Sequence, residues 1–456
     1  MLTLLGYTVV LAVLSFLTTK AFTGTLRAAG TAYWAGWIML AVCTVYAEWR
    51  GLAPPVDDDA ITMVAAAHAA AFVAFLAGSA LASGTKRHSL RYPIQSLVDS
   101  ERLVRRFLRP WLGTLALAGL VHLIQQVLFV GVSLSGLMTD LRVSYLETQS
   151  LSIAGRIYSY LVTSVGLLLV LFARSDRLYG IRLKRIALLV LSMAFGGFAL
   201  GGRGFLIAPV FTYIAAYLMM PKIASGVRGS WTTLTRKIVL YLAAAVIVFA
   251  ALGELRWGLD RFSEDVPFYV RVVDNPAAWI ATSMRGITPF VNTFSSLEAH
   301  GRVFGEWPVV QLERLGLLSG DTQRDLIDVR AAVLSSYGDP ANFPPTIIPF
   351  LYGDWGSSGW LIAYFVICLV SQFLTLSLDV SKFPAHLLST LLVMAMFYTI
   401  QAALFFSANN CVALIWLGVF YLILIATRPQ KSLVRNVLPQ RNVLFSLDPD
   451  RLPKSK

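Results

Sequence analysis

The stretch "IALLVLSMAFGGFALGGRGFLIAPVFTYIAAYLMM", residues 186–220, decides the class of fold because it holds two long apolar runs joined by one short turn. The runs cover 186–200 and 205–220, and a single charged residue, Arg203, stands between them among glycines. A helix needs roughly 20 apolar residues to cross a hydrocarbon core of about 30 Å. The stretch therefore predicts two adjacent membrane-spanning helices with an arginine in the turn between them.

The same apolar pattern recurs along the whole chain, which is 57% hydrophobic and 14% charged, with a mean hydropathy of +0.67. The short alternating segments that are typical of a β-barrel are not visible in the sequence. We predict an all-α polytopic membrane protein with about eleven transmembrane helices. The first run has no basic leader and no evident cleavage site, so we expect it to be a retained helix. The expected spans are 2–19, 31–48, 60–83, 111–135, 154–173, 186–201, 204–220, 238–253, 359–378, 385–406 and 410–427.

The distribution of lysine predicts the orientation. Although the net charge is +13, every lysine falls on the segments that alternate counting of spans places on one side. An excess of Lys and Arg marks the cytoplasmic side of a membrane protein. We therefore expect the N-terminus on the outer side and the C-terminus on the cytoplasmic side. The basic charge is assigned to topology and to contact with anionic membrane lipids, and not to nucleic-acid binding.

The spans and the charges predict four regions. Transmembrane helices 1–8 are expected in 1–253, a large periplasmic loop in 254–345, a re-entrant segment with helices 9–11 in 346–427, and a cytoplasmic tail in 428–456. The loop is too long for a simple connection. Its apolar pieces at 279–297 and 307–318 predict short helices on the outer membrane face. The prolines and glycines of 337–360 predict irregular backbone, which at membrane depth lines a cavity or is covered by protein.

Arg203 is the first candidate for the site. The glycines around it allow close approach of a ligand, and the start of the next helix is a natural anion site. An alternative is that the side chain of Arg203 only reaches lipid phosphates at the membrane surface. The periplasmic loop carries arginines but no lysine, and the planar fork of arginine binds phosphate in a bidentate manner. Pairing with acids of the loop is the alternative for several of these arginines, which are Arg256, Arg261, Arg271, Arg285, Arg302, Arg314, Arg324 and Arg330.

Several motifs together resemble the Wzy-type oligosaccharide repeat-unit polymerases of bacterial O-antigen and capsule synthesis. They are the Arg–Gly turn at 201–204, the late external loop with "SMRGITPFVNTFSSLE" and the segment "PTIIPFLYGDWGSSGWLIAYF". "LRVSYLE" (141–147), with Arg142 and Tyr145, looks like the early external Arg-x-x-Tyr segment of many members. The resemblance covers roughly 140–380. Its last motif consists here of Leu351, Tyr352, Asp354, Trp355, Gly356 and Gly359.

The resemblance implies a glycosyltransferase C-like fold and an enzyme that works on undecaprenyl-diphosphate-linked oligosaccharides at the periplasmic face. The growing glycan would pass from its lipid diphosphate to a hydroxyl of a new lipid-linked repeat unit, with no cofactor and no bound metal. A chain-length regulator and a flippase are the expected protein partners. An O-antigen ligase, which uses the same donor, and a lipid-linked oligosaccharide flippase or other transporter remain as alternatives.

This chemistry assigns roles to residues. Arginines aimed at the leaving diphosphate stabilise its charge, and we expect Arg203 and Arg285 to do so. A general base must accept the proton of the acceptor hydroxyl, and His300 is the first candidate because of its pKa range. Other candidates for the base are Glu254, Glu298, Glu306 and Asp354. The residues expected to bind substrate are Arg142, Tyr145, Glu254, Arg256 and Asp354.

Two histidines inside predicted spans receive structural roles. His122 shares one helix face with Gln125 and Gln126, and we expect these side chains to form interhelix hydrogen bonds, with contact to a lipid-linked sugar as the alternative. His68 is expected to lie in the core.

Overall fold

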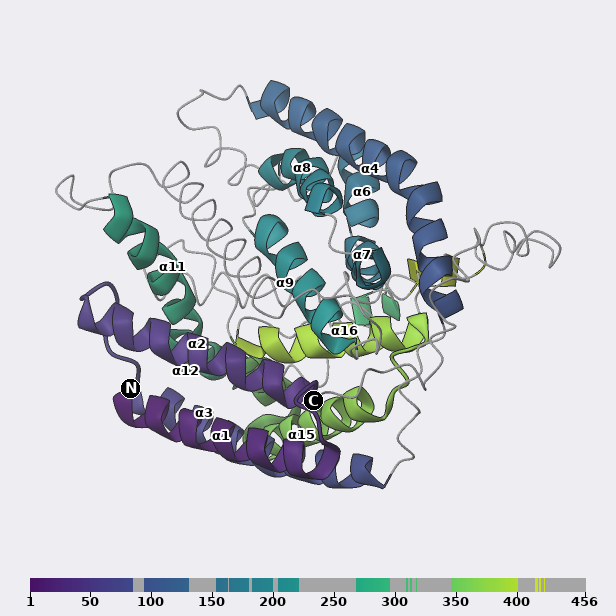
Figure 1. Ribbon diagram of the computed structural model, residues 1–456. Helices are drawn as coiled ribbons and strands as arrows, with labels where there is room; N and C mark the ends of the chain where they lie inside the picture. Colours follow the sequence, from purple (N-terminus) through teal and green to yellow (C-terminus); the bar gives the residue numbers. More distant parts are fainter. Residues whose placement is uncertain are drawn as a thin grey trace, which may run out of the picture. The chain divides into compact units, whose positions relative to one another are not determined.

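The computed structural model (Figure 1) describes residues 1–84, 94–130, 153–162, 164–179, 183–199, 204–220, 268–295 and 346–400, with a few isolated positions in 309–317 and 415–422. The chain divides into two compact units, Met1–Leu414 and Ile415–Lys456. All helices named below belong to the first unit. Within the described residues the regular structure is helical and no strand is present.

Short connections join the first three helices of the chain. The bounds of the helices are α1 Leu2–Thr23, α2 Ala29–Trp49, α3 Asp58–Ser83, α4 Ile94–Val130, α6 Ile153–Val162, α7 Val165–Tyr179, α8 Leu183–Ala199, α9 Gly204–Met219, α11 Phe268–Arg285, α12 Ile287–Ser295, α15 Ile347–Ser377, α16 Phe383–Phe397 and the 3₁₀ turn η2 Tyr398–Ile400. A helix begins directly after Arg203, as the sequence predicted.

Six helices in the described part are long and apolar enough to cross a membrane. They are α1, α2, α3, the 110–128 part of α4, α15, and α16 with η2. The helices α6, α7, α8 and α9 are shorter, with 10, 15, 17 and 16 residues. The expected span 238–253 lies outside the described residues, and so does 410–427 apart from isolated positions. The prediction of an α-helical membrane protein is thus supported, while the number of spans stays a prediction.

The best-defined core lies between α1, α2, α3 and α15. Tyr33, Trp34 and Trp37 of α2 are fully buried there, together with Phe75 of α3 and Tyr364 of α15. The face of α3 that meets this core is rich in small residues: Ala60, Ala67, Ala71, Ala74 and Gly78. Small side chains let helix backbones approach closely, which is how helices pack within a membrane. His68 is buried in the same core, as predicted, and its Nδ1 lies 2.8 Å from the hydroxyl of Tyr33.

The N-terminus of α2 is capped by side chains of a helix more than 300 residues away in sequence. Thr375 Oγ1 accepts a hydrogen bond from the amide of Ala29 at 3.1 Å, and Gln372 Oε1 accepts one from the amide of Gly30 at 2.9 Å. Gln372 Nε2 donates in turn to Ser79 Oγ at 2.9 Å and to Thr19 Oγ1 at 3.4 Å. The first amides of a helix have no partner within it, so the side chains of α15 supply the acceptors and join α1, α2 and α3.

The span expected over 154–173 is not one helix. It consists of α6 and α7, with Ser164 in a turn directly before α7. Ser164 is buried at this break, where its hydroxyl donates to the carbonyl of Leu161 and accepts a hydrogen bond from Trp111 Nε1 at 2.7 Å. Serine side chains that bond to nearby backbone compete with regular helix hydrogen bonds. The apolar pattern in this segment could not reveal the bond to Trp111, which comes from α4.

The segment 337–360 also differs from the expectation of irregular backbone. From Ile347 onward it is helical, with one interruption at Gly356. Pro349 does not break the helix because it lies in the first turn, where a missing N–H costs no helix hydrogen bond. The part of this segment before Thr346 lies outside the described residues.

In the described part of the loop 254–345, the helices α11 and α12 lie near the first of the two apolar pieces, 279–297 and 307–318, in which the sequence predicted helices. The first prediction corresponds to the second half of α11 and to α12, and α11 begins earlier, at Phe268. In the second piece only isolated positions are described, and four of these, 309–310 and 312–313, are helical.

We expect Gly36→Ala to lower the stability of the protein. A Cβ at Gly36 would lie 2.6 Å from the carbonyl oxygen of Phe397, so α2 and α16 would have to separate. Overpacking of this kind costs about 1–3 kcal/mol. The measurement is the thermal unfolding midpoint of the purified protein in detergent. Gly113→Ala in α4 is the control, because a Cβ at Gly113 would meet nothing within 4 Å; equal midpoints for the two variants would contradict the close contact.

Candidate functional site

The segment from Leu351 to Gly359 combines a buried acid with a break in a helix of membrane length. Gly356 has φ 69° and ψ −171°, a conformation that is essentially restricted to glycine. Residues 355–358 are exposed, whereas Leu351 before the break and Trp360 after it are buried in the core. Glycine is therefore required at position 356 by the conformation of the backbone.

Asp354 lies in the last turn of the first part of α15, two residues before the break, and is only 8% exposed. Trp355 next to it is 45% exposed. Gly359 lies close to this tryptophan, since a Cβ at Gly359 would lie 2.9 Å from Trp355 Cβ. The two glycines thus have separate structural roles. Gly356 permits the break in the helix, and Gly359 leaves room for the side chain of Trp355.

Arg285 lies in the last turn of α11 and is half-buried. A cation in this position interacts favourably with the partial negative charge of a helix C-terminus. The neighbours of Arg285, Met284 and Ile287, are fully buried in the same core cluster as Ile347 and Leu351 of α15. Arg285 and the motif of α15 therefore belong to one junction of α11, α12 and α15.

The position of α11 is fixed by contacts with the end of α2. Asp274 is 1% exposed, and its carboxylate accepts hydrogen bonds from Tyr46 at 2.7 Å and from Arg50 at 3.1 Å. The bond to this carboxylate raises the pKa of Arg50, which lies just beyond α2. Ala281 of α11 also packs against Ala47 and Ala53. The junction is thereby tied to the connection between α2 and α3.

The structure describes two of the residues that the sequence assigned to the site, Arg285 and Asp354. The predicted residues Arg203, His300, Arg142, Tyr145, Glu254 and Arg256 lie outside the described residues. Their roles remain predictions. Within the part of the chain that the structure describes, no group of three or more His, Cys, Asp or Glu side chains is placed to hold a metal ion.

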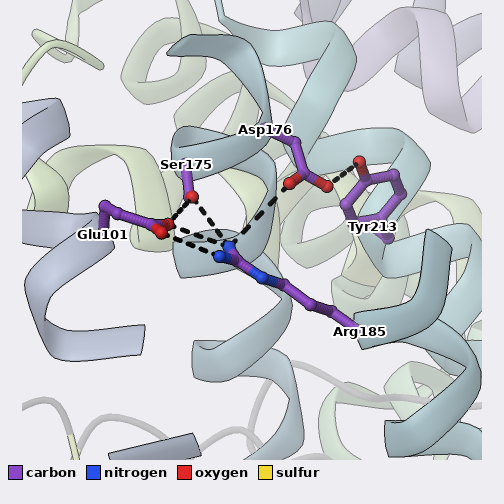
Figure 2. Close-up of polar contacts among 5 residues, drawn as sticks. All are labelled: Glu101, Ser175, Asp176, Arg185 and Tyr213. Atoms are coloured by element: carbon purple, nitrogen blue, oxygen red, sulfur yellow. Dashed lines mark hydrogen bonds and ion pairs between the residues drawn. The ribbon is translucent and has the colours of Figure 1, made fainter. Parts of the chain in front are cut away.

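A second polar cluster, which the sequence analysis did not predict, joins α4, α7, α8 and α9 (Figure 2). Arg185 forms a bidentate pair with Glu101, with Nη2 2.8 Å from Oε1 and Nη1 2.9 Å from Oε2. Ser175 donates to Glu101 and accepts from Arg185 Nη1 at 2.8 Å. Asp176 lies 4.0 Å from the same Nη1 and accepts a hydrogen bond from Tyr213 at 2.8 Å. All five residues are buried.

Arg174 extends this cluster, which we call the Arg174–Arg185 network, to α16. It is fully buried and donates from Nε to Ser100 Oγ at 3.1 Å, and from Nη1 and Nη2 to the carbonyls of Val380 and Ser381 at 3.1 and 2.8 Å. Nη1 also lies 3.4 Å from His386 Nδ1, and His386 Nε2 lies 2.8 Å from the carbonyl of Ala216. Because arginine cannot accept, His386 accepts at Nδ1 and donates at Nε2.

This network corrects one interpretation of the sequence. The basic residues of 174–185 were assigned to topology and to contact with anionic lipid, but Arg174 and Arg185 are buried and bonded to protein. Two arginines and two carboxylates balance in charge, which is the condition for keeping ions away from water. The available signal was the presence of acids, Glu101 and Asp176, within segments that are otherwise basic.

His122 lies where the sequence placed it, in the interior of the helices. It is 0% exposed and packs so closely on α6 that a Cβ at Gly155 would lie 2.7 Å from its ring. Gln126 is also buried. This face of α4 is therefore buried against another helix, and the expected interhelix hydrogen bonds stay a prediction.

Comparisons of the chain with protein-family models, with curated proteins and with solved structures find no match. The class of protein therefore follows from the chain itself. It is an α-helical membrane protein with six helices, in its described part, that are long and apolar enough to span a bilayer.

We expect Glu101→Gln to destabilise the protein, because it leaves Arg185 buried without its bidentate carboxylate. Loss of one partner of a buried ion pair costs about 3–5 kcal/mol, and the remaining contact with Asp176 favours the lower end. The measurement is thermal unfolding of the purified protein in detergent. Lys184→Gln changes the exposed neighbour of Arg185 and serves as the control, with an unchanged midpoint expected. A midpoint for Glu101→Gln equal to that of the control would show that the pair does not hold the helices together.

Proposed function

We propose that the protein is a membrane glycosyltransferase that polymerises oligosaccharide repeat units linked to undecaprenyl diphosphate. The observation that carries the proposal is the junction of α11, α12 and α15. There the motif "LYGDWGSSG" breaks a membrane-length helix at Gly356 and keeps Asp354 almost buried, while Arg285 ends α11 next to Met284, which is buried in the same core cluster as Leu351. A buried acid, a half-buried arginine and an exposed tryptophan are the groups that a sugar diphosphate substrate requires.

The reaction is the transfer of the growing glycan from one lipid carrier to another. The bond between the anomeric carbon and the diphosphate breaks, and a hydroxyl of the acceptor repeat unit forms the new glycosidic bond. The lipid diphosphate leaves with the electron pair, and a general base takes the proton of the hydroxyl. Arginines aimed at the leaving group stabilise its charge, and this kind of preorganised stabilisation is a large part of catalysis.

Residues of the chain take the following roles in this proposal. Arg203 and Arg285 bind the diphosphate and stabilise it as it leaves, and His300 accepts the proton. Asp354 binds the sugar or replaces His300 as base, since its carboxylate is almost buried next to the break at Gly356. The remaining substrate contacts are assigned to Arg142, Tyr145, Glu254 and Arg256.

The proposal includes a location and an architecture. The site faces the periplasm of a bacterial inner membrane, with the N-terminus outside and the C-terminus inside, in a glycosyltransferase C-like arrangement of about eleven spans. The distribution of lysine and the absence of lysine from 254–345 support this orientation. A chain-length regulator and a flippase are the proposed partners.

The Arg174–Arg185 network bears on the alternative of a transporter. Transporters use charges near the middle of the membrane to bind ions or cargo. In this network the charged groups are bonded to one another, to serine hydroxyls and to backbone carbonyls. A closed network of this kind supports a structural role and does not favour transport.

We expect Arg203→Lys to abolish polymerisation nearly as completely as Arg203→Ala. Lysine keeps the charge but not the bidentate fork, and loss of one preorganised donor lowers the rate roughly 10²–10³-fold. The assay uses purified protein and a lipid-diphosphate-linked repeat unit, with single repeats and polymer separated on a gel. Arg156→Lys, at an exposed position of α6, is the control and should polymerise normally.

If Arg203→Lys polymerises at the rate of the unaltered protein, Arg203 is only an anchor in the lipid headgroups. The same assay with a lipid A core as acceptor separates the two related enzymes. Glycan transfer to the core without polymer formation would replace the polymerase by an O-antigen ligase.

We expect His300→Ala to reduce the polymerisation rate about 10²–10⁴-fold, the usual effect of losing a general base, while binding of the lipid-linked donor is retained. Asp354→Asn is measured beside it and should change the concentration of substrate needed for half-maximal rate more than the maximal rate. The reverse pattern, with full activity of His300→Ala and a collapsed maximal rate for Asp354→Asn, would move the role of base to Asp354.

A further inference from the structure

The N-terminus of α15 is a buried helix end without a cap. Its N-cap residue, Thr346, is 0% exposed and has φ −60° and ψ 171°, the usual backbone conformation of a cap. Its side chain nevertheless makes no capping hydrogen bond. The amides of Ile347 and Ile348 have no acceptor within the helix, because the first N–H groups of any helix lack one. Buried donors of this kind require an acceptor from elsewhere.

The hydroxyl of Thr346 is itself buried without a hydrogen-bond partner. Such a group destabilises a folded protein, and native proteins avoid it unless a water or a ligand completes the bond. Four further hydroxyls among the described side chains share this condition. Two of the four are those of Ser283 in α11 and Thr288 in α12. Both residues lie within three positions of Arg285 in sequence, at the junction of α11, α12 and α15.

Another buried helix start, that of α2, shows how the fold satisfies such groups with side chains of the protein. At the N-terminus of α2 the first two amides are bonded to Thr375 and Gln372 of α15. At the N-terminus of α15 the residue that should serve as cap is present and its hydroxyl is unused. The difference identifies the start of α15 as a place where a ligand, and not a side chain, completes the hydrogen bonds.

The electrostatics of the junction select an anionic ligand. A helix N-terminus carries roughly half a positive charge, and Arg285 lies between Met284 and Ile287, which pack in the same cluster as Ile347 and Ile348. Phosphoryl oxygens accept hydrogen bonds from helix amides and hydroxyls.

We propose that Thr346 and the first amides of α15 bind a phosphoryl group of the lipid-linked diphosphate, beside Arg285. The inference rests on the proposed function, which names that substrate, and it adds a subsite of neutral donors to the arginines. Thr346 is a binding residue in this subsite: its hydroxyl donates to a phosphoryl oxygen and takes no part in proton transfer.

The test measures binding, not turnover. Undecaprenyl diphosphate is titrated into purified protein in detergent, and the dissociation constant is read from tryptophan fluorescence. We expect Thr346→Val, which keeps the shape and loses the hydroxyl, to weaken binding roughly tenfold or more, the effect of losing one hydrogen bond to a charged group. Thr346→Ser restores the hydroxyl and should bind within about twofold of the unaltered protein.

Ser389→Ala is the matched control, because Ser389 of α16 is also fully buried with an unpartnered hydroxyl but does not lie at a helix start. It should bind like the unaltered protein. Thermal unfolding without ligand should show no loss of stability in Thr346→Val, since the hydroxyl has no partner to lose. Equal affinity of Thr346→Val and the unaltered protein would overturn the subsite.

Two further titrations identify the source of the phosphoryl group. Inorganic pyrophosphate should compete with the lipid in the unaltered protein and less well in Thr346→Val. Phosphatidylglycerol in mixed micelles should not compete; competition that depends on Thr346 would reassign the site to an ordinary lipid headgroup and overturn the proposal. Binding that depends on Thr346 in a protein that forms no polymer would refute the proposed function and leave the subsite intact.

Discussion

Polar groups that are removed from both water and lipid headgroups must find their partners within the protein, and this constraint organises the structure. Without water, an unsatisfied amide or hydroxyl costs several kcal/mol. Gln372 shows the solution most clearly: one side-chain amide accepts from the start of α2 and donates to hydroxyls of α1 and α3. Since apolar side chains gain little from leaving lipid, such bonds and close packing of small residues determine which helices meet.

The same constraint explains the choice of arginine in the Arg174–Arg185 network. The three nitrogen atoms of Arg174 donate hydrogen bonds to a serine of α4 and to two carbonyls between α15 and α16. A lysine carries one nitrogen at the end of a flexible chain and could not reach these acceptors together. The rigid fork therefore allows one side chain to fix three parts of the chain at a depth where water does not compete.

The sequence predicted what depends on local pattern and missed what depends on distant partners. The helices near 2–19, 31–48 and 60–83, the helix start after Arg203 and the burial of His68 all follow from apolar runs, turns and composition. The break at Ser164 and the burial of Arg185 depend on Trp111 and Glu101, which no periodicity connects to them. At the candidate site, the motif with Asp354 was recognised, but the uncapped Thr346 became visible only when burial and hydrogen bonding were known.

The break at Gly356 also sets the fit between α15 and a bilayer. As an unbroken helix, the 31 residues of α15 would rise about 46 Å, far more than a hydrocarbon core of about 30 Å. The part from Ser357 to Ser377 rises about 32 Å, which matches that thickness with little tilt. With that part across the hydrocarbon core, residues 347–355 would lie toward the headgroups and Trp355 and Trp360 would lie near the boundary, where indole rings are favoured. The conformation of Gly356 thus divides α15 into one part that matches the thickness of the hydrocarbon core and another part that can carry Asp354.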